Sequence, residues 1–290
     1  ATNYHLAIKE LVGLAVDEAA PHHSTLSDVK RRPREVGGWS YFEAMGESVL
    51  QQALAAGIQL GKIQVVDSVH TVADVDNTAD RERQQQGKPP RDPQAQLVKK
   101  GKRRQTGPDG KVTQKEVQYL GYKSHVSLDA ETGLITSILP SRGKAADNAQ
   151  FAKLLAHDEQ IAVAAEVYAG DMAYDDTDLH YRLWETGKHS ALRLNDYRTR
   201  SSNVHRQFWQ GVQDAVEYQL GEAERYKIER KFGEAKRWHG FGRCRYPGLL
   251  RYGIQAHLMA LALNMKRIVT LLTGVRFRRG SRKAVAALGA

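Results

Sequence analysis

The spacing of apolar residues changes along this chain, and each change predicts a different kind of element. Over residues 41–57 the apolar positions recur with a helical period and end at a glycine, which predicts an amphipathic helix. Residues 62–75 are β-branched and apolar, which predicts one or two buried strands. Residues 76–115 are polar and basic and hold four of the eight prolines. We therefore expect an extended or disordered excursion there, which orders on a polyanion.

The second half of the chain predicts a hairpin followed by alternating helices and strands. Two β-type stretches, 117–129 and 134–140, flank the short turn AETG. The later elements are expected to be a helix at 147–160, a short buried strand ending near Gly170, a helix stopping at Gly187, a strand at 189–195, and helices from about 204 to 272 with a break at 243–248. This order predicts an α/β architecture with a mixed sheet. We divide the chain into a small helical N-terminal region (1–58), an α/β domain (59–275) and a basic tail (276–290).

Composition favours a nucleic acid as the partner. Lys and Arg number 43 against 33 Asp and Glu, which gives a net charge of +10. A merely basic enzyme is the alternative reading. The single cysteine, Cys244, excludes an intramolecular disulfide framework and a cysteine-rich zinc site. The most apolar run, 254–272, contains His257, Lys266 and Arg267 and is too interrupted for a membrane span. No signal peptide is evident, so we expect a cytoplasmic protein without a membrane partner.

Two aspartates follow predicted strands directly. Asp67 closes the stretch IQVVD, and Asp171 comes just after EVYAG. Because ligand sites gather at the carboxyl ends of strands in open α/β sheets, these side chains are candidates for one site, which Glu229 on a late helix would complete. Carboxylates without thiolates suit Mg²⁺ or Mn²⁺. From the residues alone, both aspartates are equally readable as turn or cap residues, and Asp171 has three competitors nearby, namely Asp175, Asp176 and Asp178.

The stretch ERYKIERKFGEAKRWHGFG predicts a helix with two distinct sides. Ile228, Phe232 and Ala235 share one side, which gives the helix an apolar stripe to bury. On a neighbouring side, Arg225, Glu229 and Lys236 fall within about 40° of one another. Arg225 and Glu229 are also spaced as an ordinary surface ion pair, and the segment alone does not separate the two interpretations.

The chain resembles bacterial insertion-sequence DDE transposases, whose catalytic domain is ribonuclease-H-like, in four ordered stretches: VVDSVHTVADV, YLGYKSHVSLDAETGLI, YAGDMAYDD and ERYKIERKFGEAKRWHG. Those enzymes carry the helix signature Tyr-x2-Arg-x3-Glu-x6-Lys. Arg225, Glu229 and Lys236 match its last three members at the correct spacing, whereas Glu222 replaces the tyrosine. Tyr218, one turn earlier, is the alternative for that tyrosine's contact with DNA. Residues 11–32 also resemble the end of the helical domain that precedes the catalytic core in this family.

The resemblance implies a ribonuclease-H-like mixed sheet flanked by helices and preceded by a small helical N-terminal region. It implies that Asp67, Asp171 and Glu229 are catalytic and hold Mg²⁺, for which Mn²⁺ substitutes. The activity implied is cleavage at the ends of an insertion sequence and joining of the 3′-hydroxyls to target DNA by two-metal phosphodiester transfer. The implied partner is double-stranded DNA, as terminal inverted repeats and target, bound by a homodimer in a bacterial cytoplasm. The DNA-binding residues expected are Arg225, Lys236, Lys100, Lys102, Arg103 and Arg104.

Two other functions stay open at this point. One is a catalytically silent DNA-binding protein derived from a transposase, and the other is a ribonuclease-H-like nuclease without strand transfer. Among the remaining side chains, we expect Trp184, Trp209 and Trp238 to be core or helix-packing aromatics. His125, on a predicted strand, is either strand surface or a neighbour of the active site.

Overall fold

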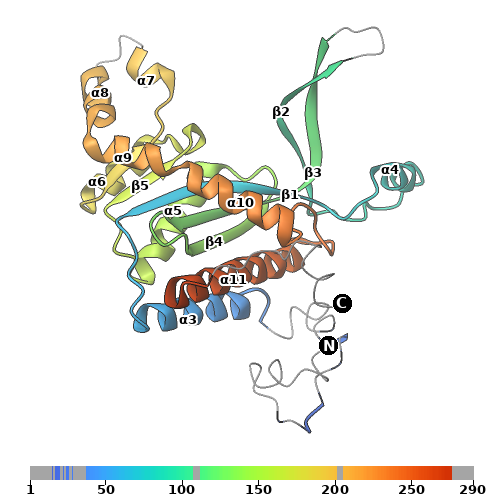
Figure 1. Ribbon diagram of the computed structural model, residues 1–290. Helices are drawn as coiled ribbons and strands as arrows, with labels where there is room; N and C mark the ends of the chain where they lie inside the picture. Colours follow the sequence, from blue (N-terminus) through green and yellow to red (C-terminus); the bar gives the residue numbers. More distant parts are fainter. Residues whose placement is uncertain are drawn as a thin grey trace, which may run out of the picture.

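The structure is a computed structural model that describes residues 37–106, 112–200 and 205–275, together with a few isolated residues before residue 37. The expected helices of the first 36 residues and the basic tail at 276–290 lie outside these residues. The described part has a mixed sheet flanked by helices (Figure 1), so the expected α/β, ribonuclease-H-like fold class is confirmed. The domain boundaries stay a prediction.

Within the described residues, the sheet has six strands. Their bounds are β1 Ile63–Val72, β2 Gln96–Thr106, β3 Val112–Asp129, β4 Ile135–Arg142, β5 Val167–Gly170 and β6 His189–Leu192. The inner half of β3 lies between β1 and β4 and is antiparallel to both. On the other side of β1, β5 and then β6 follow in parallel. The predicted hairpin and the predicted strands before Gly170 and after Gly187 are therefore confirmed.

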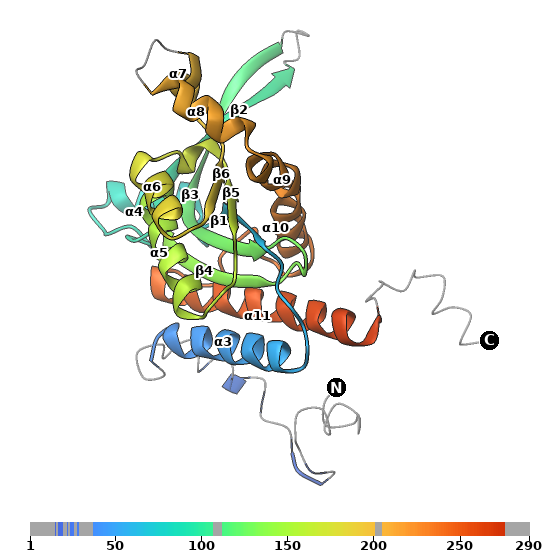
Figure 2. The ribbon, with the colours of Figure 1, turned by 90° about the vertical axis from the view of Figure 1, so that its left-hand side faces the viewer.

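Helices cover both faces of the sheet. Their bounds are α3 Ser40–Ala55, α4 Asn77–Gln85, α5 Asp147–Gln160, α6 Thr177–Glu185, α7 Asp196–Arg200, α8 Arg206–Asp214, α9 Val216–Glu224, α10 Tyr226–Trp238 and α11 Leu249–Thr273. One face packs against α9, α10 and α11, and the opposite face packs against α5 and α6. The helix α3 lies outside α11 (Figures 1 and 2). No helix within the described ranges has the length and apolar character needed to cross a membrane.

Alternation along β1 assigns its side chains to the two faces. Val65 and Val69 belong to the core shared with α9, α10 and α11, whereas Val66 belongs to the core shared with α5 and α6. Asp67 stands between Val65 and Val69 in this alternation. Its side chain therefore points to the face that α9 and α10 cover.

In the described residues of the polar excursion, 76–106 and 112–115, the extended alternative of the expectation is confirmed for the strands, and the helix α4 is an element that was not predicted. The Asp76 side chain accepts hydrogen bonds from the backbone N–H groups of Thr78 and Ala79, at 2.9 and 3.2 Å, and so caps α4. Further along, β2 pairs with the outer half of β3, and the two strands form an arm that rises from the sheet (Figures 1 and 2). A cap and a backbone ladder order this segment, and neither requires the apolar residues whose scarcity suggested disorder.

Buried polar contacts fix the start of the arm. Asp92, which is 2 % exposed, accepts a hydrogen bond from the Tyr122 hydroxyl at 2.6 Å and another from the backbone N–H of Gly248 at 3.1 Å. Tyr122 lies on β3, and Gly248 directly precedes α11. One carboxylate thus ties the excursion both to the sheet and to the last helix.

Candidate active site

Asp67 and Asp171 lie side by side where the parallel pairing of β1 and β5 ends. The register of parallel β1 and β5 pairs Val66 with Gly170, and each aspartate is the next residue along the chain. Asp171 directly follows β5, as predicted. The expectation that Asp67 closes its strand is wrong, because antiparallel pairing with β3 continues β1 to Val72. The backbone of Asp171 is still extended, with φ −71° and ψ 166°, so the strand alternation continues to it. Its side chain consequently points to the same face as that of Asp67, as Ala169 does two residues earlier.

Burial raises the pKa of the Asp67 carboxyl from its ordinary value of 3.8 to about 6. The carboxylates of Asp171 and Asp147 add to the rise, whereas a hydrogen bond from the Ser68 backbone N–H, at 2.7 Å, and the charge of Arg225 oppose it. The net result is a carboxyl whose ionised form the protein itself does not fully compensate. Asp171 is exposed, so the pair faces solvent.

The sequence places α9 and α10 over these aspartates by close packing. Gly221 on α9 lies so near β5 and β6 that a Cβ atom there would come within 2.4 Å of Ala191 Cβ and 3.2 Å of Ala169 Cβ. Only glycine permits this approach. Ile228, Phe232 and Ala235 of α10 are buried in the core that also contains Val65 and Val69, as predicted from the apolar stripe.

The flank of α10 beside that stripe carries the three residues singled out by spacing. Arg225, at the junction of α9 and α10, forms an ion pair of 3.1 Å with Glu222. Glu229, one turn further, is exposed, and so is Lys236. Within the described residues, no three His, Cys, Asp or Glu side chains are close enough together to hold a metal ion. The structure therefore brings Asp67, Asp171 and Arg225 together, and it places Glu229 on the helix above them without a direct contact.

The family model of the transposase DDE domain matches residues 67–265. The chain belongs to this family. The match begins at Asp67 and continues past Asp171 and all of α10 into the second half of α11. The family assignment therefore rests on the segment that contains every element of the candidate site.

Solved structures similar to this DDE-domain chain include two complexes of the Mos1 transposase. The Mos1 strand transfer complex is 10 % identical over 94 % of this chain and 70 % of that chain, with a TM-score of 0.27. The Mos1 mariner paired end complex with Mn is 10 % identical over 93 % of this chain and 74 % of that chain, with a TM-score of 0.25. Similarities this distant support no conclusion about the site of this chain.

The competing aspartates beyond β5 have other partners in this transposase domain. Burial alone would raise the pKa of Asp175, but hydrogen bonds from His180, Arg198 and Asn195 outweigh it and hold that pKa well below its ordinary value. The Arg198 Nε atom is 2.7 Å from the carboxylate. Asp176 caps α6 by accepting hydrogen bonds from the first backbone N–H groups of that helix. Asp171 is left as the aspartate of this loop that faces Asp67.

Sequence reasoning missed Asp147 as a neighbour of the site. Asp147 begins α5 and lies 2.9 Å from Lys123 Nζ and 3.2 Å from His125 Nδ1. Burial would raise the pKa of Asp147, but the neighbouring His125 and the hydrogen bonds from Lys123 outweigh it and hold the pKa at about 2. His125 is fully buried, so the reading as strand surface is wrong. The only sequence signal was the position of Asp147 at a helix start, which is also what an ordinary cap residue shows.

The four expected DNA-binding cations of the excursion, Lys100, Lys102, Arg103 and Arg104, lie on β2. The side chains of Lys100, Lys102 and Arg103 are outside the described part of the structure, while that of Arg104 is exposed. Their strand belongs to the projecting arm (Figure 1). It pairs with β3 only as far as Gly121, whereas Asp67 lies opposite Val126 further along β3. Tyr218, the suggested substitute for the signature tyrosine, is buried in the core and so does not offer its ring to DNA.

The three tryptophans do not share one role. Trp209 is buried, and its ring lies 4.4 Å from the Arg198 guanidinium carbon, so the expectation of a packing residue is confirmed for it. Trp184 is 70 % exposed and Trp238 is 51 % exposed. For these two residues the expectation is wrong, because an aromatic residue in a helical pattern does not reveal which flank of the helix meets the core.

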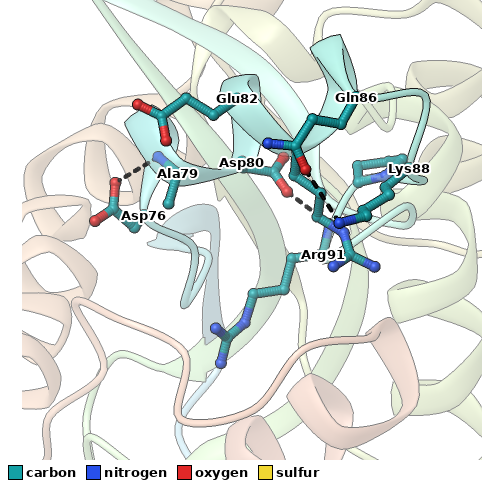
Figure 3. A pocket seen from close by; sticks show the side chains of 9 residues that line it. Asp76, Ala79, Asp80, Glu82, Gln86, Lys88 and Arg91 are labelled. Atoms are coloured by element: carbon teal, nitrogen blue, oxygen red, sulfur yellow. Dashed lines mark hydrogen bonds between the residues drawn. The ribbon is translucent and has the colours of Figure 1, made fainter.

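A hollow of about 530 Å³ lies beside α4, and its lining does not point to catalysis or ligand binding. Its polar groups bond to one another (Figure 3): Asp76 caps α4, Asp80 accepts from the Arg91 backbone N–H at 2.7 Å, and Lys88 donates to Gln86 at 3.0 Å. These contacts close the turn that leads from α4 into β2. We therefore assign the hollow a structural role.

Proposed function

We propose that this member of the transposase DDE domain family is a transposase that cuts the ends of an insertion sequence and joins them to target DNA. In the first reaction, water attacks a phosphodiester at the element end, and the bond to the 3′-oxygen breaks to leave a 3′-hydroxyl. In the second, that hydroxyl attacks a target phosphodiester and displaces another 3′-oxygen. Both are in-line displacements at phosphorus, and the second forms one phosphodiester bond for each one that it breaks.

The observation that carries the proposal is that Asp67 and Asp171 directly follow the last parallel pair of β1 and β5, Val66 with Gly170, on the face that α10 covers. Two carboxylates this close repel each other, and the Ser68 backbone N–H and the charge of Arg225 compensate the charge of Asp67 only in part. Such an arrangement costs stability unless a cation joins it. Because the pair lowers the stability of the fold, its presence favours a role in binding a ligand over a role in folding.

The donor set fits a hard divalent cation. Asp67 and Asp171 offer carboxylate oxygens beside each other, and burial combined with like charge already disfavours the unneutralised pair. Glu229, on the facing flank of α10, is the residue we assign to complete the set. A bound Mg²⁺ or Mn²⁺ would supply charge neutralisation at the scissile phosphate and a lowered pKa of the attacking hydroxyl.

The side chains around the carboxylates would orient the DNA. Arg225, held by its 3.1 Å ion pair with Glu222, and Lys236, three turns along α10, would contact phosphates next to the scissile bond. The cations of the β2–β3 arm would bind more distant phosphates without reading sequence. The assembly of two copies on two DNA ends remains part of this proposal.

The test is metal-dependent nicking of a supercoiled plasmid that carries the terminal repeats of the element. Asp171→Ala and Glu229→Ala should leave binding to the ends largely intact and reduce nicking by roughly 10³-fold or more. Undiminished nicking by both variants would remove the catalytic assignment.

A second assay separates a transposase from a simple nuclease. Pre-cleaved ends are mixed with an unmarked target plasmid, and joined products are counted. A transposase yields joined products that need the 3′-hydroxyl, whereas a nuclease yields none. A protein that binds the ends but neither nicks nor joins them would be a silent descendant of the family.

A further inference from the structure

A basic groove of about 970 Å³ lies on the other flank of α10 from Arg225, Glu229 and Lys236. Its walls are α10, the second half of α11 and the turn between β3 and β4, which lie together in Figure 2. Six cationic side chains line it against two acidic ones, Glu131 and Glu234. The cations are Lys227, Arg230, Lys231, Arg237, Lys266 and Arg267.

The backbone of the β3–β4 turn holds two of these cations in place. Lys227 Nζ donates to the Ala130 carbonyl oxygen at 2.9 Å, and the Arg267 Nε atom donates to the Thr132 carbonyl oxygen. Neutral acceptors position these side chains but do not cancel their charges. These two contacts therefore hold cationic groups at the groove without neutralising them.

Carboxylates in the groove compensate the charge only in part. Glu234 is committed to Lys266, at 2.5 Å, and is 3.9 Å from Lys231. Lys227 also pairs with Glu224, just outside the groove. Among the described residues, no carboxylate lies within ion-pair distance of Arg230, Arg237 or Arg267. Lys227 with Glu224 and Lys231 with Glu234 have the i,i+3 spacing of an ordinary solvated helix face. Arg230 and Arg237, on the same flank, have no such partner among the described residues and depart from that pattern.

Lys231 is the buried member of the set, with only 12 % of its side chain exposed. Burial lowers its pKa below the ordinary value, and the charges of Arg267 and Lys266 add to that effect, while Glu234 opposes it. Holding an ammonium group in this position costs free energy in the protein alone. An anion in the groove would offset that cost.

Taking the proposed function as given, we infer that this groove binds the phosphodiester backbone of double-stranded DNA, at phosphates other than those of the scissile site. The helix α10 separates the two flanks, and a helix with its side chains is about 10–12 Å across. One helix thus serves two stretches of DNA backbone, with the carboxylates on one side and the groove on the other. Arg230, Arg237 and Trp238 form the exposed rim of the groove.

The experiment measures the affinity for a labelled duplex of about 30 base pairs of arbitrary sequence, in EDTA, at several salt concentrations. The groove variant is the double substitution Arg230→Gln and Arg237→Gln, which changes two exposed side chains. The matched control is Arg182→Gln with Lys188→Gln, which removes the same charge from α6 and the loop after it, near Glu159 on the opposite face of the sheet.

We expect the groove variant to bind the duplex roughly 10- to 100-fold more weakly at about 0.1 M salt, with a salt slope smaller by about two, and the control to change by less than about threefold. Lys231→Met should also weaken binding while leaving the melting temperature unchanged or higher. Equal losses in the two double variants, or no loss in either, would overturn the inference.

This experiment does not depend on catalysis, because no metal is present. A groove that binds DNA in a protein that never nicks it would support the groove and count against the proposed function. Nicking by the wild-type protein combined with unaltered binding by the groove variants would support the proposed function and count against the groove.

Discussion

Asp67 lies on β1, and Asp175 lies in the loop that follows the neighbouring strand β5. Their surroundings shift the pKa values of the two carboxyls in opposite directions. Burial raises the pKa of Asp67 to about 6, and Asp171 beside it adds to the rise. The side chain of Asp175 is completely buried, yet Arg198, His180 and Asn195 hold its pKa well below the ordinary value. The fold therefore compensates the negative charge of one buried carboxylate, Asp175, but compensates that of Asp67 only in part. The uncompensated carboxylate is the one available to a ligand.

The largest effect expected from this contrast concerns catalysis. Asp67→Asn keeps the shape of the side chain but removes its charge, so nicking in Mg²⁺ should fall by roughly 10³-fold or more. Asp178→Asn, an exposed aspartate at the start of α6, is the matched control and should stay within about threefold of the wild type. Similar nicking rates for the two variants would mean that Asp67 contributes no more to nicking than Asp178 does.

The second effect concerns stability at the compensated aspartate. Arg198→Met leaves the Asp175 carboxylate buried without its permanent cation, and the free energy of unfolding in urea should fall by about 3–5 kcal/mol. Adding Asp175→Asn should restore a large part of the loss, because the uncompensated charge is then gone. A loss of less than about 1 kcal/mol in the single variant would mean that Arg198 does not compensate this charge.

The third effect is a pH dependence in the metal-free protein. Because the folded pKa of Asp67 is about 6 and the ordinary value is 3.8, the folded state binds the proton more tightly than the unfolded state does. This carboxyl therefore lowers stability as pH rises from about 4 to 6. Asp67→Asn should be more stable than the wild type by about 1–3 kcal/mol at pH 7 and equally stable at pH 3.

Asp175 should show the opposite sign in the same titration. Its pKa is lowered by folding, so its contribution to stability is present above about pH 4 and is lost on further acidification. Comparing urea unfolding of Asp67→Asn and Asp175→Asn between pH 3 and 7 therefore gives two differences that run in opposite directions. A pH-independent difference for Asp67→Asn would contradict its raised pKa.

The smallest effect concerns the position where the family signature has a tyrosine. Glu222 holds Arg225 by an ion pair that is partly exposed on both sides, so its contribution to stability should be below about 1 kcal/mol. Glu222→Gln should leave the melting temperature within a few degrees and reduce nicking about two- to fivefold, because Arg225 is less well positioned. Glu222→Tyr restores the signature and tests whether a tyrosine at this position works better.

Much of the fold was readable from local patterns. The buried strands β1 and β5, the hairpin of β3 and β4, and the apolar stripe of α10 each have a period or a turn signal of their own. The β2–β3 arm was not readable, since backbone pairing and the Asp76 cap order it in place of apolar burial. The exposure of Trp184 and Trp238 was equally hidden, because it depends on which neighbours the helices meet.

The candidate site was predictable only in part. Strand ends pointed to Asp67 and Asp171, and the register of β1 and β5 places them side by side. The residues alone left Asp171 and Asp175 as alternatives, and the family resemblance favoured Asp171. The structure adds that the buried Arg198 already engages Asp175. The electrostatic effect of Asp147 on Asp67 also needed the structure, as this effect acts between α5 and β1 across 80 residues of chain (147 minus 67). The groove on the far flank of α10 depends on α11 and the β3–β4 turn, which no helical pattern in α10 alone reveals.

Mn²⁺ binding, followed by the electron paramagnetic resonance signal of the free ion in the presence of DNA ends, tests the central claim most directly. Asp67→Asn, Asp171→Asn and Glu229→Gln should each weaken binding by roughly 10-fold or more, while Asp178→Asn and Asp175→Asn, checked for folding, should bind as the wild type does. Full Mn²⁺ binding by the first three variants, or its loss in Asp175→Asn alone, would contradict the account.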